Sequence, residues 1–435
     1  MTIKNSFIVF SIVTALNKGA ALLYFPLLIS FLSIEDYGIW TLCFLAANVC
    51  APLFALGGVA SVLRESSEKH DNRSMSLLII YSICSFFIFT AIYLIYEALF
   101  LEHLIWVKYA FIYGECLAVL ALLSSYYRGK NQVVLYGVTN LLPVLLLFIV
   151  MLVSKSNSQD IVGLFTFQVY SYSLAAFLSV LIFVVLNHGE LKKLKQSSLD
   201  ELQIKRSFSF SISLLPHNIS QWLLSSSDRY IISALIGVKA VGVYSIAYNL
   251  AQVLMLVNSG LALTVQPFLI RNYKAWVDNN YSDKFFSLYT IVAAFLFFAL
   301  CSFIALDGNY NFLSIDYGSD LYFVFFFVYI SLYFLGAYYF FVNFLFYHKK
   351  GNEISKVTIL VCFLNVTLSY FMASQVGLVG VAIANLFSYL VYLLITKSKA
   401  LKVDANAHFS LFKTSALFIL IMFTVFCSFI SFWWV

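Results

Sequence analysis

Residues 207–248 read SFSFSISLLPHNISQWLLSSSDRYIISALIGVKAVGVYSIAY, an apolar span long enough to cross a bilayer that nevertheless carries polar side chains. Polar groups at membrane depth are costly and are usually functional. On a helical period of about 3.6 residues, one narrow stripe collects Ser207, Ser211, Asn218, Gln221, Ser225 and Arg229, with Asp228 at its edge. We therefore expect this stripe to face protein or water rather than lipid.

The composition of the whole chain is that of a polytopic membrane protein. Of 435 residues, 62% are hydrophobic and 11% are charged, whereas a soluble domain has roughly 25% charged residues. Many separate apolar runs reach the length of about 20 residues that spans a hydrocarbon core as a helix. The alternation over about 10 residues that marks a transmembrane barrel is missing. The sequence therefore predicts an all-α membrane protein.

Hydropathy predicts about twelve core membrane helices and a further C-terminal segment. The predicted spans are 7–33, 38–63, 76–100, 104–128, 133–153, 161–187, 207–236, 242–268, 285–306, 321–346, 354–374, 376–397 and 410–433. The last of these could be a thirteenth span or could lie partly in the interface, because it contains Lys413 and ends in Trp433 and Trp434.

Lys and Arg set the orientation of these spans. Nearly all of them fall in the connections that lie on one side when the N-terminus is placed in the cytoplasm, and positive charge is retained on that side. The net charge of +6 is thereby explained by topology, and it needs no nucleic acid as a partner. The connections on the other side are short.

An internal repeat divides the chain into two halves. ISFLSIEDYGIW at residues 29–40 is echoed by ISALIGVKAVGVY at residues 232–244. Asn48 lies ten residues past Gly38, and Gln252 lies ten residues past Gly242, which predicts a buried amide at the same depth in both halves. We expect a six-helix lobe at 1–190, a cytoplasmic linker at 191–206, a second six-helix lobe at 207–397 and an additional hydrophobic segment at 398–435. Two lobes in the same orientation are a transporter architecture.

Two ionisable residues lie near the middle of predicted spans. Lys18 in the first span could line a cavity that holds an anionic substrate, or it could form a structural pair with Glu115 in the fourth span. Glu115 could alternatively take up a proton in an ion-coupling relay. Both interpretations remain open on the sequence alone.

Asp228 and Arg229 are adjacent, so their side chains leave a helix about 100° apart and are expected to contact different neighbours. For Asp228 we expect a structural ion pair at the outer gate, with ion coupling as the alternative. Arg229 is the better substrate ligand because a guanidinium matches the geometry of phosphate. Arg64, at the inner end of the second span, could meet a phosphate from the cytoplasmic side or could simply anchor the topology.

Enzymatic chemistry has no support in the motifs. No phosphate-binding G-x-x-x-x-G-K-[ST] loop, H-E-x-x-H zinc motif or G-x-S-x-G elbow is present. The seven cysteines lie in apolar runs without metal-ligand spacing, so we expect packing residues and no metal site, disulfide framework or cofactor. The predicted outer loops are too short to build a catalytic site for lipid-linked sugars. Transport is the favoured class.

Three segments resemble one known family. LLP with DRYII and VGVYSIAY (residues 214–248), EDYGIW (35–40) and GLVGVAIANLFSYLV (377–391) are similar to the Wzx-type O-antigen and polysaccharide flippases of the multidrug/oligosaccharidyl-lipid/polysaccharide exporter (MOP) superfamily. The resemblance covers residues 1 to about 397.

This resemblance implies a protein of the bacterial inner membrane that flips undecaprenyl-pyrophosphate-linked O-antigen or capsule repeat units from the cytoplasmic to the periplasmic leaflet. It implies alternating access between two lobes, an H⁺ or Na⁺ gradient as the drive, and a polysaccharide polymerase and chain-length regulator as partners. Lys18 and Arg229 would lie along the cationic cavity. Two alternatives remain, a small-molecule exporter like the MATE transporters of the same superfamily and a membrane-embedded polysaccharide polymerase or ligase.

Overall fold

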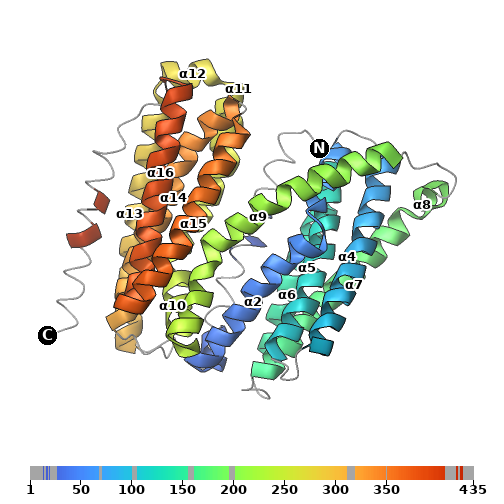
Figure 1. The fold of residues 1–435 in the computed structure, drawn as a ribbon, viewed down its shortest axis with the longest axis horizontal. Coiled ribbons are helices and arrows are strands. Elements are labelled where there is room, and N and C mark those ends of the chain that lie inside the picture. The colour runs from blue at the N-terminus through green and yellow to red at the C-terminus, as the bar shows by residue number, and fades with distance from the viewer. Residues whose placement is uncertain are drawn as a thin grey trace. The chain divides into compact units, whose positions relative to one another are not determined.

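A computed structural model describes most of the chain, and the described residues are helical apart from short turns and caps (Figure 1). They are residues 13, 16–17, 19, 27–67, 71–99, 105–154, 161–194, 201–310, 319–348, 350–406, 418–419 and 422–424. The chain divides into two compact units, Met1–Trp222 and Leu223–Val435. The boundary falls inside the 35-residue helix α9 (Glu201–Leu235).

Unit 1 is built around the helix α5 (Ile105–Gly129). Five helices pack against it, namely α2 (Ile34–Phe54), α3 (Gly58–Ser67), α4 (Asp71–Leu99), α6 (Val133–Ser154) and α7 (Ile161–Leu186) (Figure 1). The short helix α8 (His188–Leu194) follows. Ser33 caps α2 by accepting a hydrogen bond from the Asp36 amide. The acidic residues Glu35 and Asp36 in the first turn interact favourably with the positive end of the helix dipole.

The predicted continuous span 38–63 is wrong, because the helix breaks between α2 and α3. Pro52 lies in the last turn of α2, and the next turn places Leu56 and Gly57 at positive φ, 49° and 67°. Glycine adopts such a conformation without the steric cost that a Cβ imposes. The break redirects α3 toward the first half of α9.

Unit 2 is built around the helix α14 (Ser319–Tyr347). It packs against α10 (Val238–Ala251), α11 (Val253–Arg271) and α16 (Leu378–Val403), and α16 packs in turn against α15 (Gly351–Val376) (Figure 1). The helices α12 (Tyr273–Asp278) and α13 (Tyr281–Tyr310) complete it. The core is aromatic: Tyr289 and Tyr333 stack with ring centroids 5.3 Å apart.

Nine helices in the described part of the chain are long and apolar enough to cross a membrane, and the pair α10 and α11, bent by 47°, adds a tenth if it counts as one span. The chain is a multi-pass helical membrane protein. Most of the predicted spans 7–33 and 410–433 falls outside the described residues. Helix α9, which covers the predicted span 207–236, is not among the apolar helices because of its polar side chains.

One carboxylate joins three segments at an end of unit 2. Asp404, at the C-terminal end of α16, accepts hydrogen bonds from the Tyr273 hydroxyl and from the Asn406 amide, and its Oδ2 lies 2.9 Å from His348 Nε2. Burial acts to raise the pKa of Asp404, but the bonds from Tyr273, His348 and Asn406 outweigh it, so the pKa lies below its usual value. The negative charge is therefore part of the folded structure.

Acid is expected to weaken this junction. A carboxyl whose pKa is lower in the folded than in the unfolded protein contributes stability above its unfolded value of about 3.9, and that stability is lost as the pH falls through the folded pKa. Asp404→Asn should therefore reduce the drop in the thermal unfolding midpoint between pH 6 and pH 3. Asp278→Asn is the control, since Asp278 is exposed and has no ion pair among the described residues. Equal slopes for the wild type and Asp404→Asn would contradict the assignment.

Candidate functional site

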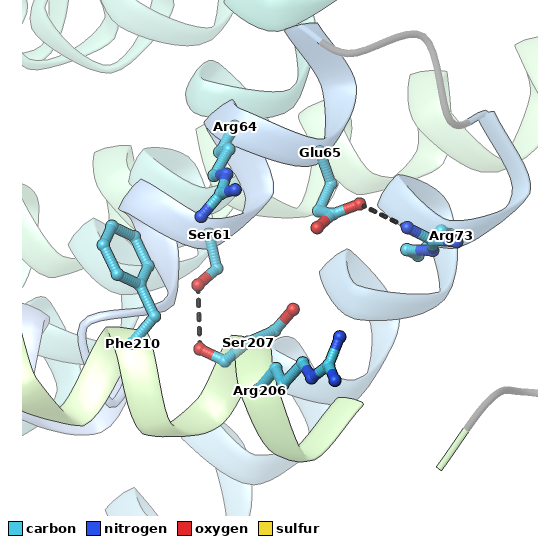
Figure 2. Close-up of a pocket in the computed structure, with 7 residues that line it drawn as sticks. All are labelled: Ser61, Arg64, Glu65, Arg73, Arg206, Ser207 and Phe210. Atoms are coloured by element: carbon cyan, nitrogen blue, oxygen red, sulfur yellow. Dashed lines mark hydrogen bonds and ion pairs between the residues drawn. The ribbon is translucent and has the colours of Figure 1, made fainter. Parts of the chain in front are cut away.

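A basic pocket of about 220 Å³ lies in unit 1, where the end of α3 and the starts of α4 and α9 meet (Figure 2). Its lining residues are Ser61, Arg64 and Glu65 from α3, Arg73 from α4, and Arg206, Ser207 and Phe210 from α9. The end of α5 lies at the same end of unit 1, since Gly129 packs against Ser66, and Arg128 lies in this last turn of α5.

Three guanidinium groups and one carboxylate line this pocket. Arg73 Nη1 lies 3.3 Å from Glu65 Oε2 (Figure 2). The Arg64 guanidinium carbon lies 5.8 Å from the centre of the Phe210 ring, a cation–π distance. Arg206 is exposed and has no ion-pair partner among the described residues.

Hydrogen bonds fix α9 against α3 and α4 beside this pocket. The Ser61 hydroxyl donates to the Ser207 carbonyl (3.0 Å) and lies 2.5 Å from the Ser211 hydroxyl, which also lies 2.9 Å from the Tyr81 hydroxyl. The Tyr81 ring stacks on Phe208 at 4.6 Å. Because these donors and acceptors are buried, breaking one leaves another unpaired, and the pocket wall is held in place.

A buried polar network lies in unit 2 and joins α9, α10, α15 and α16. Arg229 Nη1 lies 2.9 Å from Asp228 Oδ1, and both residues are buried. The other carboxylate oxygen, Asp228 Oδ2, accepts hydrogen bonds from the Tyr244 hydroxyl (2.8 Å) and the Asn385 amide (3.0 Å). The Asn365 amide donates to Asn385 Oδ1 at 2.7 Å. The network around one carboxylate thus connects four helices.

The expectation that Asp228 and Arg229 contact different neighbours rather than each other is wrong, because the two side chains form an ion pair. The long Arg229 side chain folds back, so that its Nη1 bonds both Asp228 and the Ser225 carbonyl (2.6 Å). The guanidinium also stacks on Tyr248, 3.7 Å from the ring centre. Arg229 is only 4% exposed, so in this conformation its charge is satisfied inside unit 2.

Of the two ionisable residues predicted near the middle of spans, the structure describes only Glu115. Glu115 is half-buried and accepts a hydrogen bond from Ser85 Oγ at 2.6 Å. Lys18 lies outside the described residues, and its roles as a cavity lining and as a partner of Glu115 stay predictions.

The amide side chains that were predicted to line a cavity are exposed or half-buried in the structure. Asn48 is exposed and donates to the Phe44 carbonyl within α2, and Gln252 is half-buried where α10 ends. The expectation that both amides are buried is therefore wrong. Asn218 and Gln221 are exposed on α9. Their role in a polar cavity stays a prediction.

Several residues of both sites were missed by sequence reasoning. Arg73 and Arg206 counted there only as topological charges, and Asn385 and Asn365 were not singled out. The last two carried a signal, because both are polar residues in the middle of apolar spans. No signal in the sequence indicated that Arg73 and Arg206 line the same pocket, because helices distant in sequence bring them together.

Comparison with protein families finds one match. The family model described as "Polysaccharide biosynthesis protein" matches residues 3–273, which is more than half of the chain. No curated protein matches the chain.

Solved structures similar to the chain include transporters of the MATE type and of the MOP superfamily. An outward-facing multidrug resistance MATE transporter of this superfamily aligns with a TM-score of 0.59 and 16% identity over 93% of this chain and 96% of its own. The MATE multidrug transporter DinF-BH aligns with a TM-score of 0.59 and 16% identity over 93% of this chain and 97% of its own. A MOP superfamily transporter from Pyrococcus furiosus aligns with a TM-score of 0.59 and 15% identity over 92% of this chain and 96% of its own. That transporter is described as having a binding pocket of reverse polarity. At these identities the likeness is one of fold.

Proposed function

The chain belongs to the polysaccharide biosynthesis protein family and has the fold of MOP-superfamily transporters, and we propose that it flips undecaprenyl-pyrophosphate-linked oligosaccharide repeat units from the cytoplasmic to the periplasmic leaflet. The family and the fold are those of a transporter rather than of a catalytic enzyme. The observation that carries the proposal is the pairing of a polysaccharide family with an exporter fold over 93% of the chain. A sugar-linked lipid is the cargo that fits both.

The proposed mechanism is alternating access driven by an H⁺ or Na⁺ gradient in a bacterial inner membrane, with the N-terminus in the cytoplasm. Lys18, Arg229 and Arg64 are the proposed cationic contacts for the substrate, beside a polar stripe that includes Asn218, Gln221, Asn48 and Gln252. A polysaccharide polymerase and a chain-length regulator are the proposed partners that take the product.

The carboxylates have two proposed roles. Glu115 and Asp228 could each take part in ion coupling, or each could stabilise the packing of its own unit. The contacts of Asp228 support the second role, because its oxygens accept bonds from Arg229, Tyr244 and Asn385. For Glu115 the one hydrogen bond found among the described residues, from Ser85, leaves room for a proton on the carboxyl.

A strain lacking the protein provides the test. We expect complete single repeat units, linked to undecaprenyl pyrophosphate, to accumulate on the cytoplasmic face, together with the loss of surface polymer. The measurement is a leaflet-resolved analysis of these glycolipids. Single units that reach the periplasmic face but stay unpolymerised would indicate a polymerase instead. Unchanged glycolipids would contradict the proposal.

A small-molecule exporter is the second candidate, because the similar structures include multidrug transporters. It predicts that loss of the protein leaves the surface polymer intact and raises the cellular content of a cationic dye. The same deletion strain therefore separates the two functions.

A further inference from the structure

The face of α14 around Tyr333 is covered by a part of the chain that comes after the last of the long helices. The Phe418 ring stacks on the Tyr333 ring, with centroids 4.0 Å apart and 20° between the planes. Phe418 and Met422 are helical and each is 1% exposed, whereas Phe423 is 54% exposed. Because residues four apart share a face of a helix, this segment buries one face in unit 2 and leaves the other outside.

Tyr333 is a fixed part of unit 2. Its ring also stacks on Tyr289 of α13, with centroids 5.3 Å apart and 6° between the planes. Its hydroxyl lies 3.0 Å from Thr290 Oγ1, and its carbonyl accepts a hydrogen bond from the Tyr289 hydroxyl at 3.1 Å. Phe418 therefore packs on an aromatic surface that α13 and α14 already hold in place.

Tyr333 lies at the middle of a membrane-crossing helix. Fourteen residues separate it from each end of α14 (Ser319–Tyr347), which is long and apolar enough to span a membrane. At a rise of about 1.5 Å per residue, Tyr333 is about 21 Å from either end. The contact with Tyr333 therefore puts Phe418 at the depth of the middle of α14.

The chain approaches this depth from one end of α14. Asp404 follows the end of α16, and its Oδ2 lies 2.9 Å from Nε2 of His348, the residue after α14. Phe418 comes fourteen residues after Asp404. A helix of fourteen residues rises about 21 Å, which is the distance from the end of α14 to Tyr333.

This depth decides between a span and a segment in the interface. A helix in the interface is buried by only about 5–10 Å, whereas Phe418 is about 21 Å from the end of α14. Residues 414–435 contain no charged side chain, and their length is that of a span, about 20 residues. The seventeen residues after Phe418 cover about 25 Å as a helix, enough to reach the other end of α14.

We propose that residues 410–433 cross the membrane as a further span, docked through Phe418 on the Tyr333 face of unit 2. Val435 then lies on the side of the membrane opposite to Asp404, which is the periplasmic side in the predicted orientation. The two tryptophans before Val435 fall at that far surface, where tryptophan is favoured. The proposal rests on the packing within unit 2 and is independent of what the protein transports.

The test is the sidedness of two cysteines in the full-length protein. Val435→Cys and Ala405→Cys are made singly in a chain whose seven native cysteines are replaced by alanine. Ala405 is the control, because it is exposed directly after Asp404. A membrane-impermeant maleimide is added to right-side-out and to inside-out vesicles. We expect the two cysteines to react in opposite kinds of vesicle, and reaction of both in the same kind would overturn the proposal.

Reporter fusions repeat the measurement in a chain that keeps its cysteines. Alkaline phosphatase is active only after export, so a fusion after Val435 and a fusion after Asn406 should differ in activity at equal amounts of protein. In the predicted orientation the fusion after Val435 is the active one. Equal activities would place both ends on one side and exclude a span between them.

The docking face is tested by packing. Phe418→Ala should lower the thermal unfolding midpoint of the purified protein by several degrees, because it removes a buried ring that stacks on Tyr333. Phe423→Ala is the matched control, since it makes the same change at a ring that is 54% exposed, and it should leave the midpoint nearly unchanged. Equal midpoints for the two variants would overturn the docking of this segment on Tyr333.

Discussion

Asp228→Asn is expected to remove about 3–5 kcal/mol of the free energy of unfolding, the usual result of breaking a buried ion pair from one side. The guanidinium of Arg229 would remain buried, 4% exposed, beside a neutral amide. The change also puts an NH2 group, which cannot accept a hydrogen bond, either at the oxygen that accepts from Tyr244 and Asn385 or at the one that accepts from Arg229. The loss should appear as a large fall in the thermal unfolding midpoint of the purified protein.

A double-mutant cycle isolates the pair. Arg229→Met keeps most of the side-chain length but leaves Asp228 as the unpaired charge, so it should destabilise the protein to a similar extent. Asp228→Asn combined with Arg229→Met leaves no unpaired charge and should cost much less than the sum of the two single changes. Additive losses would contradict the assignment of Arg229 as the partner of Asp228.

An exposed ion pair in the same unit is the control. Lys399 Nζ lies 2.8 Å from Glu353 Oε2 between α16 and α15, but the two side chains are 42% and 32% exposed. Glu353→Gln should therefore lower the thermal unfolding midpoint far less than Asp228→Asn does, because an exposed ion pair contributes little to stability. The contrast between the two pairs would show that burial, and not the short contact alone, makes the Asp228 pair important.

This expectation affects how Arg229 is tested as a substrate ligand. A variant at Arg229 that loses transport could do so through instability, because the guanidinium holds Asp228 in place. Arg206 avoids this ambiguity, since it is exposed and has no ion pair among the described residues. Transport tests of Arg229 variants are therefore informative only at matched folded amounts.

Hydropathy and charge predicted the class of the protein well, for a physical reason. A helix that crosses a bilayer must make its backbone hydrogen bonds internally and expose apolar side chains to lipid. Both requirements depend on one continuous stretch of sequence, so they can be recognised without knowledge of the fold. The predicted span 161–187, for example, corresponds to α7 at Ile161–Leu186. The break after Phe54 was missed, because the run remains apolar across Ala55–Gly57 and only the backbone conformation changes.

The sites were harder to predict because they depend on contacts between distant segments. Asp228 was expected to form a structural ion pair, but the sequence did not identify its partners Tyr244 and Asn385, which lie 16 and 157 residues away. Arg73 and Arg206 meet only because α9 returns to the end of α3. Periodicity within one helix carries no information on such neighbours. It identified the polar face of α9 but could not say which positions would be buried.

Gly57→Ala is expected to cost about 2–5 kcal/mol of stability, and the turn between α2 and α3 is the reason. At a φ of 67° a Cβ adds a penalty of about 1–2 kcal/mol. A Cβ built at this position would also lie 2.5 Å from the Ser211 carbonyl oxygen, a backbone atom of α9. Overpacking of this kind costs about a further 1–3 kcal/mol. The unfolding midpoint of the purified protein is the measurement.

Two further variants separate the conformation from the close approach. Asparagine tolerates positive φ better than alanine but still has a Cβ, so Gly57→Asn should recover only the backbone part of the loss. Gly189→Ala is the control, since Gly189 is exposed in α8 and has nothing within 4 Å of an added Cβ. Equal unfolding midpoints for Gly57→Ala and Gly189→Ala would contradict this account of the turn.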